Sequence, residues 1–133
     1  TRGELCAARL DWLDRRLDQR PETPTLVALH HPPFRSGVPF MDDYGLTGRE
    51  ALVEVLARHG QVIRLVSGHL HRQVATMVAG IPATGCPGPS LQVPLTFAPG
   101  FPPATAIDEP AAVHLHLWAE GTLVTHTLYV GQA

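Results

Sequence analysis

The chain has 133 residues, of which 44% are hydrophobic and 17% charged, a balance typical of one folded domain with its own core. A formal net charge of −2 excludes the basic excess of proteins that bind nucleic acids or anionic membranes, and no apolar run reaches the roughly 18 residues of a membrane-spanning helix. Cys6 and Cys86 stand in no zinc or disulfide motif, which favours a reducing compartment, and we expect a cytoplasmic protein.

The first part of the chain predicts a helix followed by a buried strand. Thr1 and Glu4 stand at the spacing of a capping box, and leucines at helical spacing follow them until Pro21. Residues 26–29 then form a short apolar run, which is typical of a strand covered on both faces. The His-His-Pro-Pro segment after it forces a loop, because prolines exclude helical backbone there.

The same order then repeats. After an irregular stretch, Thr47 and Glu50 predict a second capped helix, which we expect to end with Gly60 as its C-cap. Residues 62–66 predict a second buried strand, and a Ser-Gly-His-Leu-His segment follows it.

Shorter extended segments and loops fill the last part of the chain. Residues 74–78 predict a strand, and residues 85–110 predict a long loop because they hold many of the prolines and glycines. Residues 112–118 and 122–130 flank a Glu-Gly turn and predict a C-terminal hairpin. Three histidines alternate along this hairpin, and we expect them to face solvent or another subunit: His114, His116 and His126.

Histidines follow both central strands at the point where each strand ends. His30 and His31 follow the first strand, and His69 and His71 follow the second. If the strands are parallel and joined by a right-handed crossover, these histidines meet at one edge of the sheet. Imidazole binds zinc, iron, manganese and similar metals, which generate hydroxide near neutral pH. The pattern therefore predicts a metal centre for hydrolysis, whereas a lone histidine usually has a structural role.

The charge of such a metal centre requires carboxylate ligands that the sequence does not clearly supply. Two divalent ions carry about +4, which neutral imidazoles do not offset, so carboxylate ligands are expected as well. Most acidic residues fall on predicted helices or in turns, and the loop pairs Asp42-Asp43 and Asp108-Glu109 stand at no recognisable ligand spacing. Asp42 is the one acidic residue that we expect near a substrate or behind the ligands.

A family resemblance rests on these same residues. The apolar strand ending in His30-His31-Pro32-Pro33, then Met41-Asp42, then Gly68-His69-Leu70-His71-Arg72, resembles the carboxyl-terminal half of a calcineurin-like metallophosphoesterase. The branch it resembles is that of class III cyclic-nucleotide and glycerophosphodiester phosphodiesterases, and Leu91-Gln92-Val93-Pro94 extends the similarity.

The resemblance implies an α/β fold. Residues 1–133 would form the second half of a four-layer α/β/β/α sandwich, with a mixed sheet, flanking helices and the C-terminal β-hairpin. An upstream Asp-x-His, a Gly-Asp and a Gly-Asn-His motif, which the family also needs, do not occur in these residues. We therefore expect the chain to be part of a larger domain whose first half carries those motifs.

The resemblance also implies roles for single residues. His30 and His69 would bind one of two divalent ions (Mn, Fe, Zn or Co), and His71 would bind the other. His31, Asp42 and Arg72 would lie near the substrate or behind the ligands. The full-length parent would hydrolyse a small-molecule phosphodiester, such as a 3',5'-cyclic nucleotide, through a hydroxide held by both metals, and the fragment alone would be inactive.

Two other interpretations stay open. The chain could be a non-catalytic module, oligomeric or domain-swapped, whose metal binding is incidental. It could also be a mononuclear zinc hydrolase that uses His30, His69 and His71 as a three-histidine set with an open water position. In the first case the expected partner is a second copy of the chain, whereas in the phosphoesterase interpretation it is a second copy or the missing first half.

Overall fold

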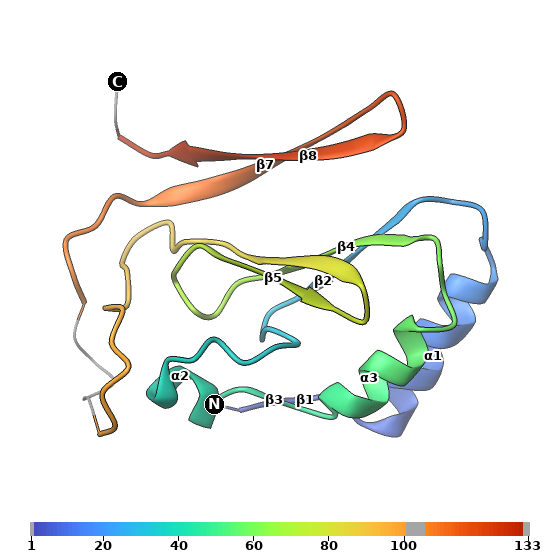
Figure 1. The fold of residues 1–133 in the computed structure, drawn as a ribbon, viewed down its shortest axis with the longest axis horizontal. Coiled ribbons are helices and arrows are strands. Elements are labelled where there is room, and N and C mark those ends of the chain that lie inside the picture. Colours follow the sequence, from blue (N-terminus) through green and yellow to red (C-terminus); the bar gives the residue numbers. More distant parts are fainter. Residues whose placement is uncertain (1, 101–105, 132–133) are drawn as a thin grey trace.

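A mixed four-stranded sheet is the centre of the fold, with two helices on one side and a β-hairpin on the other (Figure 1). The computed structural model describes residues 2–100 and 106–131. Its elements confirm the α/β class and the C-terminal hairpin. In chain order they are β1 (Gly3–Glu4), α1 (Ala7–Asp18), β2 (Thr25–Leu29), α2 (Pro39–Asp43), β3 (Leu46–Thr47), α3 (Arg49–Leu56), β4 (Val62–Ser67), β5 (Val74–Val78), β6 (Ile81–Gly85), β7 (Ala112–Ala119) and β8 (Thr122–Tyr129).

The two central strands are parallel, which is the condition for their histidines to meet at one edge of the sheet. The strand order is β2-β4-β6-β5, in which β2, β4 and β6 run parallel and β5 runs antiparallel to β6. The register of β2 and β4 shifts by one residue between Thr25 and Leu26, and Leu29 then pairs with Ser67. Both strands therefore end at the same edge of the sheet.

The main hydrophobic core lies between this sheet and the helices. The apolar faces of α1 and α3 pack against the sheet, and Leu52 and Leu65 are completely buried there. Burial of a leucine side chain contributes about 1.5–3 kcal/mol each, so this layer accounts for much of the stability. The buried members are Leu10, Leu17, Val27, Leu52, Val55, Leu56, Val62, Leu65, Val78, Ile81 and Ala83.

Both predicted capping boxes are wrong. Glu4 and Thr47 lie in β1 and β3, which pair with each other in parallel, so their backbone is extended rather than at a helix start. The Thr47 hydroxyl donates to the carbonyl of Gly3 instead of capping α3. Gly48 precedes α3 with a φ of 83°, and a Cβ there would lie 2.5 Å from the carbonyl oxygen of Leu5, so only glycine fits.

The predicted C-cap of α3 is also wrong. The helix ends at Leu56 with Ala57 as its C-cap, several residues before Gly60. The amides of Arg58 and His59 then donate to Val55 and Leu56, and these shorter i→i−3 bonds close the last turn. His59 is buried, with its Nε2 2.7 Å from Asp14 Oδ1, and it therefore ties the end of α3 to α1. Hydrogen bonds from His59 and Arg58 lower the pKa of Asp14.

A second, smaller cluster supports the loops at one end of the sheet. The stretch predicted to be irregular contains α2, whose Met41 packs with Val38 and Leu70. Leu70 lies between the two histidines of the segment that follows β4 and is only 2% exposed. Its burial anchors that segment against α2. The predicted long loop contains no strand within residues 86–100 and 106–111, apart from one isolated bridge between Gln92 and Ile107.

The hairpin turns its polar face inward. His114 and His116 are half-buried on the side facing the sheet, so the expectation that they face solvent or another subunit is wrong for these two residues. His126, in contrast, is exposed. Arg64 of β4 donates to the carbonyl of Leu123, and Thr127 donates to Gln73, so polar contacts join the hairpin to the sheet. The outer face of the hairpin is apolar and exposed, with Val113, Leu115, Leu117, Val124 and Leu128.

Candidate metal centre at the ends of two parallel strands

His30 and His69 meet where β2 and β4 end, as predicted from their positions after the two strands. His30 follows the last residue of β2, and the amide of Gly68, just after β4, donates to the carbonyl of His30. The two ring centroids are 5.4 Å apart. Parallel pairing thus brings together residues that lie far apart in the sequence.

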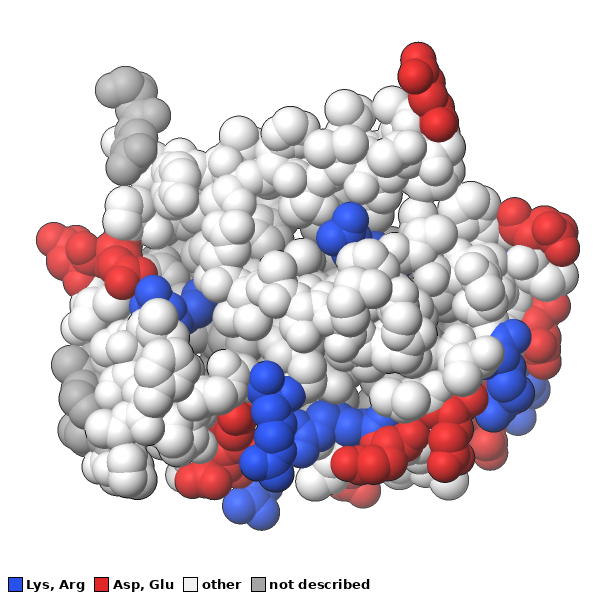
Figure 2. Space-filling view, viewed as in Figure 1, with Lys and Arg blue, Asp and Glu red and all other residues white. Residues whose placement is uncertain are grey.

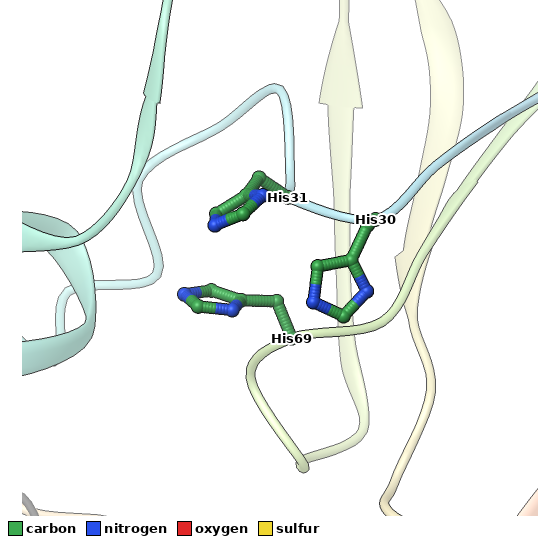
Figure 3. Close-up of side chains that lie close together, drawn as sticks. All are labelled: His30, His31 and His69. Atoms are coloured by element: carbon green, nitrogen blue, oxygen red, sulfur yellow. The ribbon is translucent and has the colours of Figure 1, made fainter. Parts of the chain in front are cut away.

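His31 joins this pair, as expected from its position after the first strand, although the family resemblance implies no ligand role for it. Its ring centroid lies 4.1 Å from that of His69 and 5.0 Å from that of His30 (Figure 3). One ring nitrogen of each of these three histidines lies within 4.8 Å of the others. Gly3 leaves the space for the His31 ring, because a Cβ at that position would lie 2.6 Å from Cγ of His31.

His69 is the most constrained member of this histidine cluster. Its Nε2 is buried and has no hydrogen-bond partner among the described residues. Burial, together with the nearby rings of His31 and His30, lowers the pKa of His69 to about 4. The ring is therefore neutral at pH 7, which is the form that binds metal. The backbone of His69 has a φ of 63°, a left-handed conformation that is rare for residues with a side chain.

These properties fit a bound divalent ion. Two imidazole nitrogens on one ion lie at most about 4.2 Å apart, twice a zinc–nitrogen bond, and the cluster is close to that spacing. An unpaired buried nitrogen is costly in the absence of a ligand. Among the described residues, no acidic side chain joins His30, His31 and His69. The carboxylate ligands that would offset the charge of the metal are therefore missing, as the sequence also indicated.

His71 lies outside the cluster. Its Nδ1 is 2.9 Å from the carbonyl oxygen of Leu91, and its φ of 51° is also left-handed. The turn at residues 68–72 therefore directs His69 and His71 to different places rather than to one side of an extended segment. The His69-x-His71 spacing predicts that both rings lie on the same side of an extended segment and chelate one ion. This prediction is wrong, because the backbone is not extended there.

The two remaining predicted site residues hold loops. The Asp42 carboxylate accepts hydrogen bonds from the amides of Ser36 and Gly37 and from the Ser36 hydroxyl, and thus closes the loop before α2. Arg72 donates to the carbonyl of Val93 and forms an ion pair with Glu109 at 3.1 Å. Gln92, which the sequence places in the Leu91-Gln92-Val93-Pro94 segment without predicting a role for it, is 2% exposed and hydrogen-bonded to Gly88.

The stability of the metal-free chain is expected to fall as the pH drops from about 6.5 towards 4. Burial is the main cause that lowers the pKa of His69, His114 and His116 in the folded state. The unfolded chain, with histidine pKa values near 6.5, then binds more protons over this range, so acid favours unfolding. Urea midpoints measured between pH 7.5 and 4.5 with a chelator present check this. The His69→Asn variant should show a shallower decline, and a constant midpoint for the wild type would contradict the prediction.

Imidazoles that converge where parallel strands end, one of them with an unpaired buried nitrogen, define a candidate metal centre of the kind found in hydrolases. None of the helices in the described part of the chain is long and apolar enough to span a membrane. No family model matches the chain. Its curated relatives, in contrast, are informative.

Three relatives illustrate the similarity. The chain is 38% identical to a probable glycerophosphodiester phosphodiesterase of Arcobacter nitrofigilis, over 98% of this chain and 48% of that protein. It is 34% identical to a 3',5'-cyclic-nucleotide phosphodiesterase of a Nostoc species, over 92% of this chain and 45% of that protein. It is 39% identical to the 3',5'-cyclic adenosine monophosphate phosphodiesterase of Escherichia coli, over 54% of this chain and 26% of that protein.

These matches confirm the resemblance predicted from the motifs. The chain is homologous to the carboxyl-terminal half of metallophosphoesterases in the cyclic-nucleotide and glycerophosphodiester phosphodiesterase branch. Nearly the whole chain matches the first two of these relatives, but it spans only about half of their length.

Proposed function

We propose that this chain supplies the histidine part of a two-metal centre in a phosphodiester hydrolase. The observation that carries this proposal is the convergence of His30 and His69 from two parallel strands, with Nε2 of His69 buried and unpaired. The relatives support the reaction class, since they are named for the hydrolysis of cyclic nucleotides and glycerophosphodiesters. Small phosphodiesters, 3',5'-cyclic nucleotides among them, are the proposed substrates of the full-length parent, and the proposed parent fold is the four-layer sandwich.

The histidines divide between the two positions of the proposed centre. His30 and His69 would hold one divalent ion, and His71, which lies apart from them, would hold the second; Mn, Fe, Zn and Co are the candidates. Divalent ions at such a centre supply hydroxide near neutral pH and stabilise charge on phosphoryl oxygens. The buried environment keeps His69 neutral, and the His31 ring lies beside that imidazole, with the two ring centroids 4.1 Å apart.

Loop contacts hold these ligands in place. Leu70 anchors the turn between His69 and His71 in the small core, and Arg72 fixes its end to the carbonyl of Val93. Asp42 keeps the loop before α2 closed beside the same core. Among the residues that the structure describes, no anionic ligand joins the cluster of His30, His31 and His69, so the chain alone is expected to be inactive and to bind at most one metal weakly.

A metal-dependence assay tests the proposed function. We expect the full-length parent protein to hydrolyse bis(4-nitrophenyl) phosphate with manganese present, and to lose this activity on dialysis against a chelator. Adding manganese back should restore the activity, because the chelator removes the metal ions while the protein stays folded. Activity that is unchanged after complete removal of metal would reject the two-metal proposal.

One observation favours a second candidate, a non-catalytic oligomeric module. The outer hairpin face exposes Leu115 and Leu117, each 52% accessible. The upper part of Figure 2, where the hairpin is seen from its side, shows few Lys, Arg, Asp or Glu residues. An apolar sheet face of this kind is typical of an interface. By size-exclusion chromatography with light scattering, the isolated chain is expected to form dimers or larger species. A single monomeric species at micromolar concentrations would contradict this expectation.

A further inference from the structure

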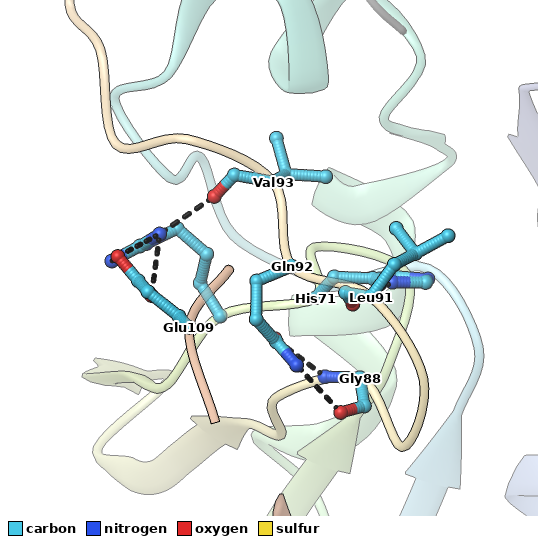
Figure 4. A network of polar contacts seen from close by, with 7 residues as sticks. His71, Gly88, Leu91, Gln92, Val93 and Glu109 are labelled. Carbon is cyan, nitrogen blue, oxygen red and sulfur yellow. Dashed lines mark hydrogen bonds and ion pairs between the residues drawn. The ribbon is translucent and has the colours of Figure 1, made fainter. Parts of the chain in front are cut away.

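Gln92 closes a short loop with both ends of its side-chain amide. Its Oε1 accepts from the amide of Gly88 at 2.9 Å, and its Nε2 donates to the carbonyl of Gly88 at 2.7 Å (Figure 4). The side chain is almost completely buried. Since the glutamine amide satisfies both peptide groups of Gly88, it fixes the segment 88–92 as one unit.

Three successive carbonyls beside this amide are also fixed. The carbonyl of Leu91 accepts from Nδ1 of His71, that of Gln92 from the amide of Ile107, and that of Val93 from Arg72 at 2.6 Å. His71 and Arg72 are thus held by two carbonyls that flank Gln92. The position of the Leu91 carbonyl depends on the loop that Gln92 closes.

The His71 ring packs directly on this loop. A Cβ on Gly88 would lie 2.3 Å from the Leu91 carbonyl oxygen and 2.6 Å from Nδ1 of His71. The absence of a side chain at Gly88 therefore gives the His71–Leu91 hydrogen bond its space. Gly88 leaves the space for the hydrogen bond between His71 and Leu91, and Gln92 closes the loop that carries the Leu91 carbonyl.

We propose that Gln92 is a positioning residue for His71, because it holds the Leu91 carbonyl that selects the tautomer of this histidine. A carbonyl only accepts, so Nδ1 of His71 carries the proton and Nε2 presents a lone pair. Groups that orient a metal-ligating histidine in this way raise metal affinity about 10- to 100-fold. The role of Nε2 as a ligand rests on the proposed function, whereas the control of the tautomer does not.

Long-range proton–nitrogen NMR of the ¹⁵N-histidine-labelled, metal-free chain tests the inference at pH 7.5. We expect the wild type to show His71 protonated at Nδ1. The Gln92→Met variant, which fills the same space without hydrogen bonds, should shift His71 towards the Nε2–H form. Gln61→Met is the matched control, since Gln61 also donates to a backbone carbonyl, that of Leu17, at the far end of the molecule. This control should leave the His71 spectrum unchanged.

The outcomes separate clearly. A wild-type His71 protonated at Nε2, or a Gln92→Met variant that keeps the wild-type tautomer, would overturn the proposal. If Gln92→Met does not fold, Gln92→Glu replaces it: the carboxylate still accepts from the Gly88 amide but cannot donate to the Gly88 carbonyl, and an unchanged tautomer there would likewise overturn the proposal.

Manganese titration of the full-length parent then tests the link to the metal. We expect Gln92→Met to weaken binding about 10- to 100-fold, with no change for Gln61→Met. Equal affinity of Gln92→Met and the wild type would overturn the positioning role in metal binding. Failure of the wild type to bind metal at all would instead count against the proposed function, and the NMR result would still decide the tautomer.

Discussion

Replacement of His69 by alanine in the full-length parent is expected to reduce hydrolysis of bis(4-nitrophenyl) phosphate at least about 100-fold. Loss of a residue that only orients a ligand costs about 10- to 100-fold, and loss of the ligand itself should cost more. His69 is the ring that contacts both His30 and His31, and its buried Nε2 has no other partner in the described residues. The initial rate at saturating manganese measures the effect.

His126→Ala is the matched control for this experiment. His126 is exposed on the outer face of the hairpin, away from the strand ends, so its removal should leave the rate unchanged. Both variants should have urea midpoints near that of the wild type, which separates loss of the ligand from loss of the fold. Normal turnover by His69→Ala would remove the basis for the phosphoesterase assignment.

Leu65→Ala is expected to lower the free energy of unfolding of the chain by about 2–5 kcal/mol. Leu65 lies in the central part of β4, is completely inaccessible, and packs in the core between the sheet and the helices. Deletion of such a side chain removes buried apolar surface and leaves a cavity that the surrounding strands cannot close. Urea denaturation, followed by far-ultraviolet circular dichroism at pH 7.5, measures the loss.

Leu115→Ala provides the comparison with the same chemical change. Leu115 is 52% accessible on the outer face of the hairpin, and in a monomer its removal should cost no more than about 0.5 kcal/mol. A loss for Leu65→Ala as small as this would contradict the core described above. A large loss for Leu115→Ala at high protein concentration alone would indicate that a second molecule covers the hairpin.

The sequence predicted the parts of the fold that depend on hydrophobic pattern. The expectation that residues 26–29 are covered on both faces is wrong, because β2 is an edge strand of the sheet and both Leu26 and Ala28 are exposed. The apolar runs nevertheless indicated the strands β2 and β4 correctly, and these strands pair in parallel. From this alone, His30 and His69 could be placed together. The family motifs also predicted the homology that the relatives confirm.

The remaining features depend on contacts between distant segments, which local patterns do not contain. The spacing of Thr47 and Glu50 resembles a capping box, but pairing of β3 with β1 determines the backbone at Thr47. Alternation along the hairpin defined two faces without showing which one is inward. The polar face lies inward because Arg64 and Gln73, on the sheet side, offer polar partners to the hairpin.

His71 shows the same limit at the site itself. Its spacing from His69 suggested one shared ion, yet both residues have left-handed backbone and point to different places. That geometry is imposed by Leu70, which is buried between them, and by the loop around Gln92. Neither influence is visible in a two-residue spacing.

The one-residue register shift between β2 and β4 has a consequence for the whole centre. Ile63 is the residue of β4 left without a partner where Thr25 pairs with Val62 and Leu26 with Arg64. If Thr25 and Val62 kept their pairing, a strand without this extra residue would place His69 about 3.3 Å further along relative to His30, with the following side chains on the opposite faces. The register that brings the two imidazoles together thus begins at the irregularity between Thr25 and Leu26, at the opposite end of the strands from the histidines.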